Sequence, residues 1–226
     1  MEEIREVKLT EQYFEVLTPR GYFNEIPYFI VRTNVTDVML ELSDEDYVRE
    51  MIRKGREDIL ESSLVAIAIT CSRFFVRQLM SPPVEMSLRE VTVWKDYRTL
   101  RIIRPLVITC SRPDRDSEYV IRQMMEAAET ARRAYVSLFE GGFNSEVAEE
   151  VLPGCTATKV IAELNLRQWR SVFSSVIADE PPPRPVRCFL GQILERLTLF
   201  LPCVFGDQFK KHRDLFSSAE KPRVNS

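Results

Sequence analysis

The sequence predicts an α+β fold, a mixed sheet flanked by long helices, in which helices dominate. Segments with apolar residues at helical spacing alternate with runs rich in β-branched residues, and Gly or Pro residues separate them. The chain has 226 residues, of which 45% are hydrophobic, enough to bury one substantial core. We therefore expect one domain over residues 1–205, followed by a polar C-terminal tail over 206–226.

The helices are predicted from their caps and their apolar spacing. After an irregular start, the segment SDEDYVREMIRKG places Ser43 and Asp46 at capping-box spacing and ends at Gly55. The longest helix is expected over residues 117–140, before a Gly-Gly pair, and a shorter one, SEVAEEVL, ends before Pro153. The core face expected for the longest helix consists of Val120, Met124, Ala127, Ala131, Ala134, Tyr135 and Leu138.

Strands are predicted where β-branched residues form short apolar runs. Residues 63–72 and 100–109 have this character, and the first run is followed by RFFVRQLM, which has helical spacing. A third strand is expected through Leu164. Asn165, a preferred N-cap residue, then opens the next helix in the segment ELNLRQWRSVF.

Charge and cysteine usage limit the partners and the compartment. The net charge is -3, from 31 basic and 34 acidic residues, which gives no general attraction to DNA, RNA or anionic membranes. Any polyanion bound must therefore be small. The five cysteines show no C-x-x-C spacing, so neither a disulfide framework nor a zinc site is indicated. With no signal-peptide pattern and no apolar run of roughly 20 residues, we expect a cytoplasmic protein.

Short catalytic motifs are absent from the sequence. There is no P-loop, G-x-G-x-x-G, nucleophile elbow or H-E-x-x-H. His212, the single histidine, makes a His-centred triad or a multi-histidine metal site untenable, and we expect it to be a solvated surface residue. Any chemistry should therefore belong to a cofactor, and no metal is expected.

The order of several short patterns resembles the flavin-dependent thymidylate synthases over roughly residues 40–178. In sequence these are GREDILES, an apolar strand, RQL, SLREVT, AYVSLFEGG, VAEEVLP, Thr158 and NLRQW. The resemblance implies that family's fold and a reaction of the dUMP methylation type, which makes dTMP. It also implies FAD as cofactor, with NADPH and methylene-tetrahydrofolate as co-substrates.

The resemblance also assigns candidate binding residues, but no catalytic side chain. Asn165 and Arg167 of the N-x-R pattern, with Glu61, would bind the flavin; we call these three the flavin set. Local sequence alone leaves another explanation open, in which Asn165 is only a helix cap and Arg167 only a helix former. The nucleotide set that the resemblance and its flanking residues imply is Gln78, Ser87, Arg89, Glu90 and Thr92.

The sequence departs from the family where phosphate-binding cations are expected. The family signature R-H-R-x-x-S-x-N-E-x-S-x-R aligns on Ser87 and Glu90, which places Pro82-Pro83-Val84 at its R-H-R. Val176 falls where the family has an essential Arg. A charge-assisted hydrogen bond is worth about 1.5 to 3 kcal/mol, so these losses would empty the usual sites unless other cations replace them. The nearby candidates for replacement are Arg73, Arg77, Arg89 and Arg98.

Further departures affect the flanking patterns. Trp94 takes the place of the signature's final Arg, and Arg56 and Ser62 stand where the family has histidines. Three functional hypotheses remain open: a divergent flavin- and nucleotide-binding member, a working thymidylate synthase of unusual sequence, and a catalytically inactive relic that serves as a structural or partner subunit.

The resemblance also implies an oligomer. We expect a homotetramer, or a heteromer with an intact homologue, because the family builds its cofactor sites between subunits. An apolar helix expected over residues 186–201, after the triple proline at 181–183, is a candidate for an additional interface. The small ligand expected is a pyrimidine nucleotide.

Overall fold

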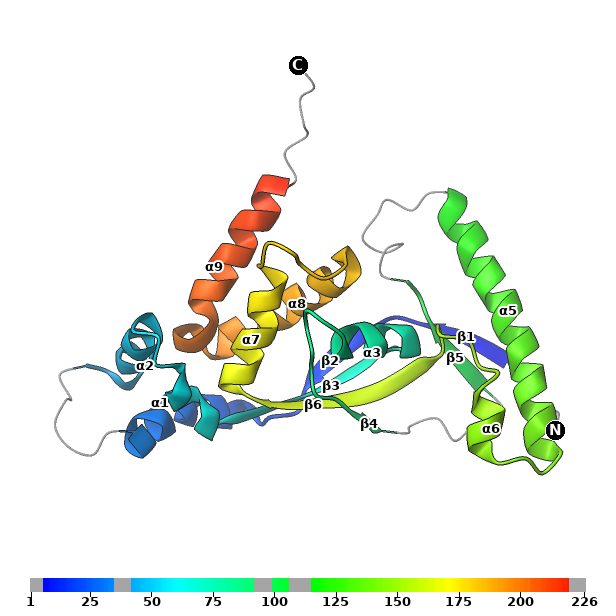
Figure 1. Ribbon diagram of the computed structural model, residues 1–226, viewed down its shortest axis with the longest axis horizontal. Coiled ribbons are helices and arrows are strands. Elements are labelled where there is room, and N and C mark those ends of the chain that lie inside the picture. Colours follow the sequence, from blue (N-terminus) through cyan, green and yellow to red (C-terminus); the bar gives the residue numbers. More distant parts are fainter. Residues whose placement is uncertain (1–5, 35–41, 92–98, 106–114, 220–226) are drawn as a thin grey trace, which may run out of the picture. The chain divides into compact units, whose positions relative to one another are not determined.

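The computed structural model describes residues 6–34, 42–91, 99–105 and 115–219 (Figure 1). Their elements fall into two compact units, which we describe separately. The first unit comprises Met1–Glu15, Ala68–Gln78 and Leu88–Ile161, and the second comprises Val16–Ile67, Leu79–Ser87 and Ala162–Ser226. Helices and strands both contribute, as predicted for the α+β class. No described helix is both long and apolar enough to cross a bilayer.

In the first unit, β1 (Glu6–Thr10) and β5 (Thr99–Ile103) form a parallel pair in the register Glu6↔Thr99 to Thr10↔Ile103. The long helix α5 (Arg115–Glu140) packs on this pair, and the short helix α6 (Ser145–Glu149) packs on α5. Their shared core consists of Leu100, Ile102 and Ala128, with Val7, Leu9, Met124, Met125, Leu152 and Cys155 around them.

The buried face of α5 is rotated from the predicted one. Ala128, Arg132 and Val136 are the most buried positions, whereas the predicted core residues Ala127 and Ala134 are exposed. Arg132 is buried because its guanidinium makes two hydrogen bonds to Glu129, at 2.9 and 2.7 Å. The apolar pattern alone could not place an internally paired Arg in the core.

A four-stranded sheet has the order β2 (Tyr13–Val16), β3 (Leu64–Ser72), β6 (Ala157–Asn165), β4 (Arg89–Val91). The central strands β3 and β6 pass from one unit into the other along the chain. Helix α3 (Arg73–Met80) follows β3 directly, as predicted. Strand β5 confirms the predicted strand only as far as Ile103, and residues 106–109 lie outside the described part of the chain.

The second unit is mainly helical: α1 (Arg20–Asn34), α2 (Asp44–Arg53), the 3-10 helix η1 (Glu57–Ser62), α7 (Leu166–Val176), α8 (Arg184–Phe200) and α9 (Pro202–Ala219). Its core contains a row of aromatic rings. Trp169 stacks on Phe173 at 5.7 Å between centroids, and Phe173 meets Phe205 edge-on at 5.6 Å. These three aromatic rings join α7 to α9.

Helix α2 confirms the predicted caps. Ser43 is the N-cap, and its hydroxyl accepts a hydrogen bond from the backbone N–H of Asp46 at 3.2 Å. At the other end Gly55 has φ of 77°, and the N–H groups of Gly55 and Arg56 donate to Ile52 and Met51, respectively. This is a Schellman ending, which requires the left-handed conformation that glycine adopts at no steric cost.

Two helices of the second unit were not predicted from the sequence. Helix α1 occupies part of the region expected to be irregular, and Pro27 lies inside it. Helix α9 continues to Ala219, through most of the expected polar tail, and Gln208 within it is 3% exposed. The extent of the domain itself stays a prediction.

Helix α8 confirms the helix predicted after the triple proline, although its apolar stripe lies inside the second unit. Seven of its residues are buried there: Val186, Phe189, Leu190, Gly191, Ile193, Leu194 and Leu197. Leu199 near its end is 69% exposed, and the additional interface stays a prediction.

His212 on α9 is half-buried against α8, which corrects the expectation of a solvated residue. A Cβ at Gly191 would lie 2.6 Å from the ring atoms Cε1 and Nε2 of His212, so only glycine permits this contact without a shift. Burial lowers the pKa of His212, the positive charge of Arg187 lowers it further, and Glu195 opposes the change.

We predict that acidification destabilises the protein through His212. Unfolded chains take up the histidine proton near pH 6.5, whereas the folded protein takes it up only at lower pH, so the free energy of unfolding falls as the pH drops below about 6.5. Urea unfolding at pH 7.5, 6.5 and 5.5 measures this fall. The variant His212→Gln should lose this pH dependence. Glu50 and Glu129 do not interfere, because their pKa values lie at about 2 and they titrate well below this pH range. Equal pH dependence in both proteins would contradict the assignment.

Candidate functional site

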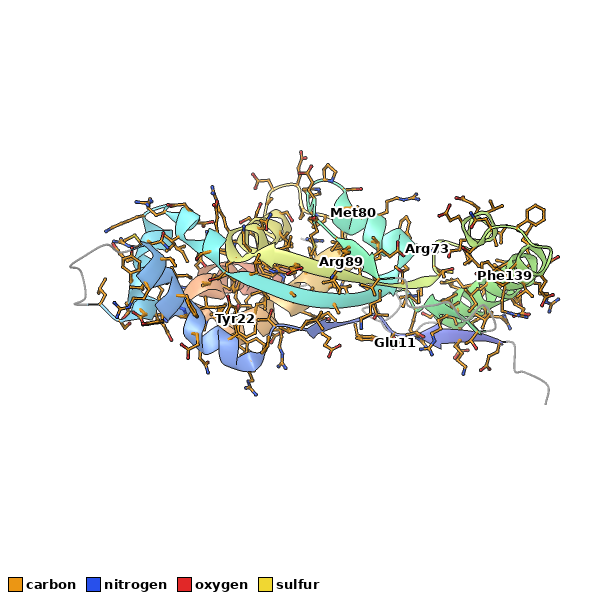
Figure 2. All side chains as sticks on the ribbon, turned by 90° about the horizontal axis from the view of Figure 1, so that it is seen from below. Glu11, Tyr22, Arg73, Met80, Arg89 and Phe139 are labelled. Carbon is orange, nitrogen blue, oxygen red and sulfur yellow. The ribbon has the colours of Figure 1, made fainter. Side chains whose placement is uncertain are left out.

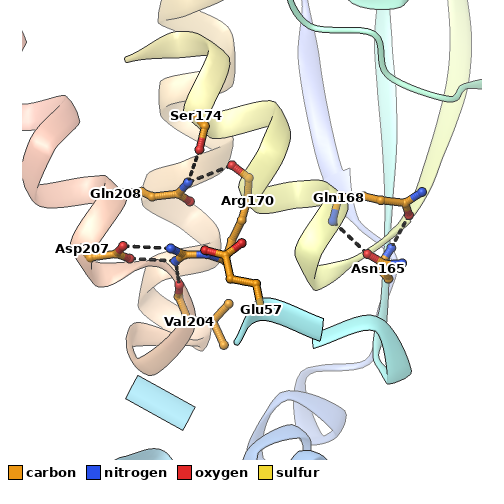
Figure 3. Close-up of polar contacts among 8 residues, drawn as sticks. All are labelled: Glu57, Asn165, Gln168, Arg170, Ser174, Val204, Asp207 and Gln208. Carbon is orange, nitrogen blue, oxygen red and sulfur yellow. Dashed lines mark hydrogen bonds and ion pairs between the residues drawn. The ribbon is translucent and has the colours of Figure 1, made fainter. Parts of the chain in front are cut away.

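Asn165 lies where β6 turns directly into α7. Its Oδ1 accepts a hydrogen bond from the backbone N–H of Gln168 at 2.8 Å, and Gln168 Oε1 accepts one from the N–H of Asn165 at 2.9 Å (Figure 3). This reciprocal capping box satisfies orphan donors at the helix start, so the abrupt change from strand to helix is stable. The cap uses Oδ1 as an acceptor, and the Nδ2 amide of Asn165 stays available as a donor to a ligand.

Arg167 and Glu61, two members of the flavin set, lie together. Arg167 Nη1 is 2.5 Å from Glu61 Oε1, and both side chains are 53% exposed. The backbone N–H of Leu166 donates to the carbonyl of Ser63 at 3.1 Å, which ties the start of α7 to the end of η1. The structure therefore joins two of the three residues of the flavin set in one ion pair, at a helix start that is exposed to solvent.

Arg170, one turn further along α7, was not singled out from the sequence. Its guanidinium is buried and bidentate to Asp207, at 2.8 and 2.9 Å, and it also donates to Glu57 at 3.0 Å and to the carbonyl of Val204 (Figure 3). Gln208 donates to the Arg170 carbonyl at 2.8 Å. The Arg170 network, formed by these five residues, joins α7 to η1 and α9.

The charges of the Arg170 network stabilise one another. Burial alone would lower the pKa of Arg170, but hydrogen bonding to Asp207, with help from Glu57, raises it above its ordinary value. Burial would raise the pKa of Asp207, but the hydrogen bonds from Arg170 lower it. Both groups therefore remain ionised in the folded protein.

A signal for Arg170 was present in the sequence. It follows Trp169 and precedes Phe173 by three positions, on the stripe of α7 that carries Leu166 and Val176. A charged residue on an apolar stripe indicates a buried ion pair. The sequence could not show its partners, because Asp207 is 37 positions away.

We predict contrasting stability effects for the two arginines of α7. Arg170→Met leaves the carboxylates of the network without their partner and should lower the free energy of unfolding by about 2 to 4 kcal/mol. Arg167→Ala breaks an exposed ion pair and should cost less than about 1 kcal/mol. Urea denaturation of both variants measures the difference, and equal losses would contradict the distinct roles assigned here.

Glu90 and Thr158 form a second contact that involves a predicted site residue. The Thr158 hydroxyl, on a side chain that is 5% exposed, donates to Glu90 Oε1 at 2.6 Å. Burial, with the negative charge of Glu90, raises the pKa of Cys71 to about 12. That thiol therefore stays protonated at neutral pH and is not a nucleophile.

The rest of the described nucleotide set lies along the segment from α3 to β4. Gln78 lies on α3, Ser87 lies between α3 and β4, and Arg89 begins β4. Within the described part of the chain, none of these three hydrogen-bonds to another predicted site residue. Thr92 lies outside the described residues, as do Trp94 and Arg98.

The segment at the family's R-H-R position is a turn that contributes to the core. The N–H groups of Val84 and Glu85 both donate to the Ser81 carbonyl at 3.1 Å. Val84 is 5% exposed, so it replaces a cation with a packed side chain. Val176, at the position of the family's essential Arg, is likewise buried in α7.

The replacement candidates differ in their availability. Arg73 is paired with Glu149 at 2.5 Å, whereas Arg89 is exposed and forms no ion pair with any described carboxylate (both are labelled in Figure 2). Among the described residues no cluster of His, Cys, Asp and Glu side chains could hold a metal ion.

The model of one protein family, described as thymidylate synthase complementing protein, matches residues 24–203. The chain belongs to this family. A search of curated proteins found no match.

Solved structures show the same fold. One is a UMP/dUMP methylase, PolB, from Streptomyces cacaoi bound with 5-Br UMP, at 16% sequence identity and a TM-score of 0.67, covering 92% of this chain and 98% of that one. The same methylase bound with 5-Br dUMP has 16% identity and a TM-score of 0.66, covering 91% and 97% of the two chains. The similarity extends over nearly the whole length of both proteins.

Proposed function

We propose that this protein binds FAD and a uracil nucleotide and belongs to the dUMP methylation type of its family. The observation that carries the proposal is the family match over residues 24–203, together with a fold shared with a UMP/dUMP methylase. The contacts Arg167–Glu61 and Thr158–Glu90 support it, because each involves at least one predicted site residue.

FAD fits the start of α7 in charge and exposure. Arg167 offers an exposed guanidinium beside a helix start, and both favour a phosphate or another anionic group. Asn165 adds its free amide nitrogen, while Glu61 holds the guanidinium in place until a ligand competes for it. When bound, reduced FAD would relay a one-carbon unit from methylene-tetrahydrofolate to the uracil ring, with NADPH as reductant.

Glu90 is the group we propose for holding the uracil nucleotide. Thr158 engages one carboxylate oxygen at 2.6 Å, which orients the carboxylate on the edge strand β4. The other oxygen can accept a hydrogen bond from a uracil N–H or a ribose hydroxyl.

We also propose that the protein is an oligomer, a homotetramer or a heteromer with an intact homologue. Exposed apolar side chains on and around α6 support this: Phe143 is 57% exposed, Val147 50% and Val151 37%. Such neighbouring apolar groups favour association. A monomer by light scattering at micromolar concentration would count against it.

We predict that Arg167→Ala weakens FAD binding about tenfold or more, since one charge-assisted contact worth about 1.5 to 3 kcal/mol is lost. Fluorescence quenching of FAD on titration with protein measures the affinity. Arg133→Ala, which removes an exposed arginine from α5, is the control and should bind FAD like the wild type. Equal affinity in wild type and Arg167→Ala would remove the proposed role.

Asn165→Ala should behave differently, because Asn165 caps α7. Its loss should lower the free energy of unfolding by about 1 kcal/mol, in addition to any effect on FAD. Arg167→Ala and Asn165→Ala together therefore separate binding from folding. A fully stable Asn165→Ala variant would contradict the capping role.

Turnover of dUMP should be slow even if both ligands bind. Pro82 and Pro83 supply neither a cation nor a backbone N–H, and Val84 and Val176 are packed in the core. We predict that tritium release from labelled dUMP, with methylene-tetrahydrofolate, FAD and NADPH, stays below roughly one tenth of an intact homologue's rate, because at least one charge-assisted contact is missing. A rate within that factor would contradict this prediction. A protein that binds neither FAD nor dUMP would instead support the inactive partner subunit.

A further inference from the structure

We propose that Arg89 on β4 and Lys159 on β6 together bind the phosphate of the uracil nucleotide, in place of the missing signature cations. The inference rests on the proposed function. It concerns residues of the first unit alone, and Lys159 was not a candidate from the sequence.

The strand register places both cations on one face of the sheet. In the antiparallel pair, Arg89 lies opposite Ile161 and Val91 lies opposite Lys159. Side chains directly opposite share a face, and so do residues two apart on a strand, so these four side chains lie on the same face. Arg89 and Lys159 are diagonal neighbours there, with backbone positions about 7 to 8 Å apart, close enough for two long side chains to contact one phosphate.

Of the two faces of β6, the one that carries Lys159 and Ile161 is the more exposed to solvent. Lys159 and Ile161 are partly exposed, whereas the alternate residues Thr158, Val160 and Ala162 are buried. Arg89 is exposed at the edge of the sheet. A ligand can therefore approach this face without any displacement of the core.

The charges of both residues are available. Arg73 and Arg104 of the same unit are neutralised by Glu149 and Glu11, respectively. In the described part of the chain no carboxylate forms an ion pair with Arg89 or Lys159. This holds also for Glu163, which lies further along the same face of β6.

The nearest acidic residue in sequence to Arg89 lies on the other face. Strand alternation turns Glu90 away from Arg89, and its carboxylate is held by Thr158. An anion beside Arg89 would therefore not meet the Glu90 charge directly. One nucleotide can therefore place its phosphate beside Arg89 on one face, while its hydroxyl or N–H reaches Glu90 around the edge of the strand.

Two cations of different kind suit a phosphate monoester. The planar guanidinium of Arg89 can donate two parallel hydrogen bonds, and the Lys159 ammonium adds a compact charge. Val91 and Ile161 supply apolar surface beside them. A carrier of one phosphate group, rather than a long polyanion, fits two cations in a chain whose net charge is -3.

The test compares dUMP with deoxyuridine, which differ only by the phosphate. Isothermal titration calorimetry of the full chain gives the ratio of the two affinities for wild type, Arg89→Gln, Lys159→Gln and the control Arg133→Gln, which removes an exposed positive charge from α5. Each single variant should weaken dUMP binding about tenfold or more and leave deoxyuridine binding unchanged. Arg133→Gln should match the wild type. Circular dichroism confirms that the variants are folded.

Three outcomes are distinguishable. A dUMP preference that falls in both variants supports the inference. Wild-type and variant proteins with the same dUMP preference would overturn it while leaving the proposed function intact. A wild-type protein that binds neither dUMP nor deoxyuridine would overturn both.

Discussion

The second unit depends on the buried guanidinium of Arg170. An unpaired charge in a protein interior is strongly destabilising, and here the Asp207 carboxylate, Glu57 and the Val204 carbonyl together satisfy it. The three acceptors lie on η1 and α9, so one side chain fixes both elements against α7. The aromatic row of Trp169, Phe173 and Phe205 packs beside it. Helix α7 can neither shift nor rotate without breaking the Arg170 network.

This constraint reaches the candidate flavin residues through the helix itself. Arg167 precedes Arg170 by three residues, nearly one turn, so a fixed inward Arg170 determines where Arg167 emerges. The capping box at Asn165 fixes the first turn from the other side. Arg167 is consequently preorganised beside Glu61, although both are half-exposed. Binding residues supported by a rigid element lose less entropy when a ligand arrives.

Packed side chains occupy positions where the resemblance predicts phosphate-binding cations. Val84 and Val176 lie in the core of the second unit, and their burial contributes stability where cations would have carried unsatisfied charge. The cations left without carboxylate partners among the described residues include Arg89 and Lys159, on the sheet of the first unit. These two cations therefore support the proposed nucleotide binding, although the family signature is degraded.

Local signals in the sequence predicted those elements whose ends are determined locally. Ser43, Gly55 and Asn165 identified helix boundaries because caps act within one turn. Helix α1 was missed because Pro27 occupies a position on its apolar stripe, between Ile26 and Ile30, and proline normally argues against a helix interior. Helix α9 was missed because its stability comes from tertiary contacts of Asp207 and Gln208. The resemblance placed Glu61 and Arg167 in one candidate site, although their ion pair was not predicted, whereas Arg170 required partners distant in sequence.

The most direct test of the central claim, that flavin and a uracil nucleotide share this protein, is the visible absorption spectrum of the protein with FAD while dUMP is added. We expect a flavin band that remains with the protein through gel filtration and changes as dUMP saturates its site. A colourless protein after gel filtration, with a spectrum that dUMP leaves unaltered, would contradict the claim.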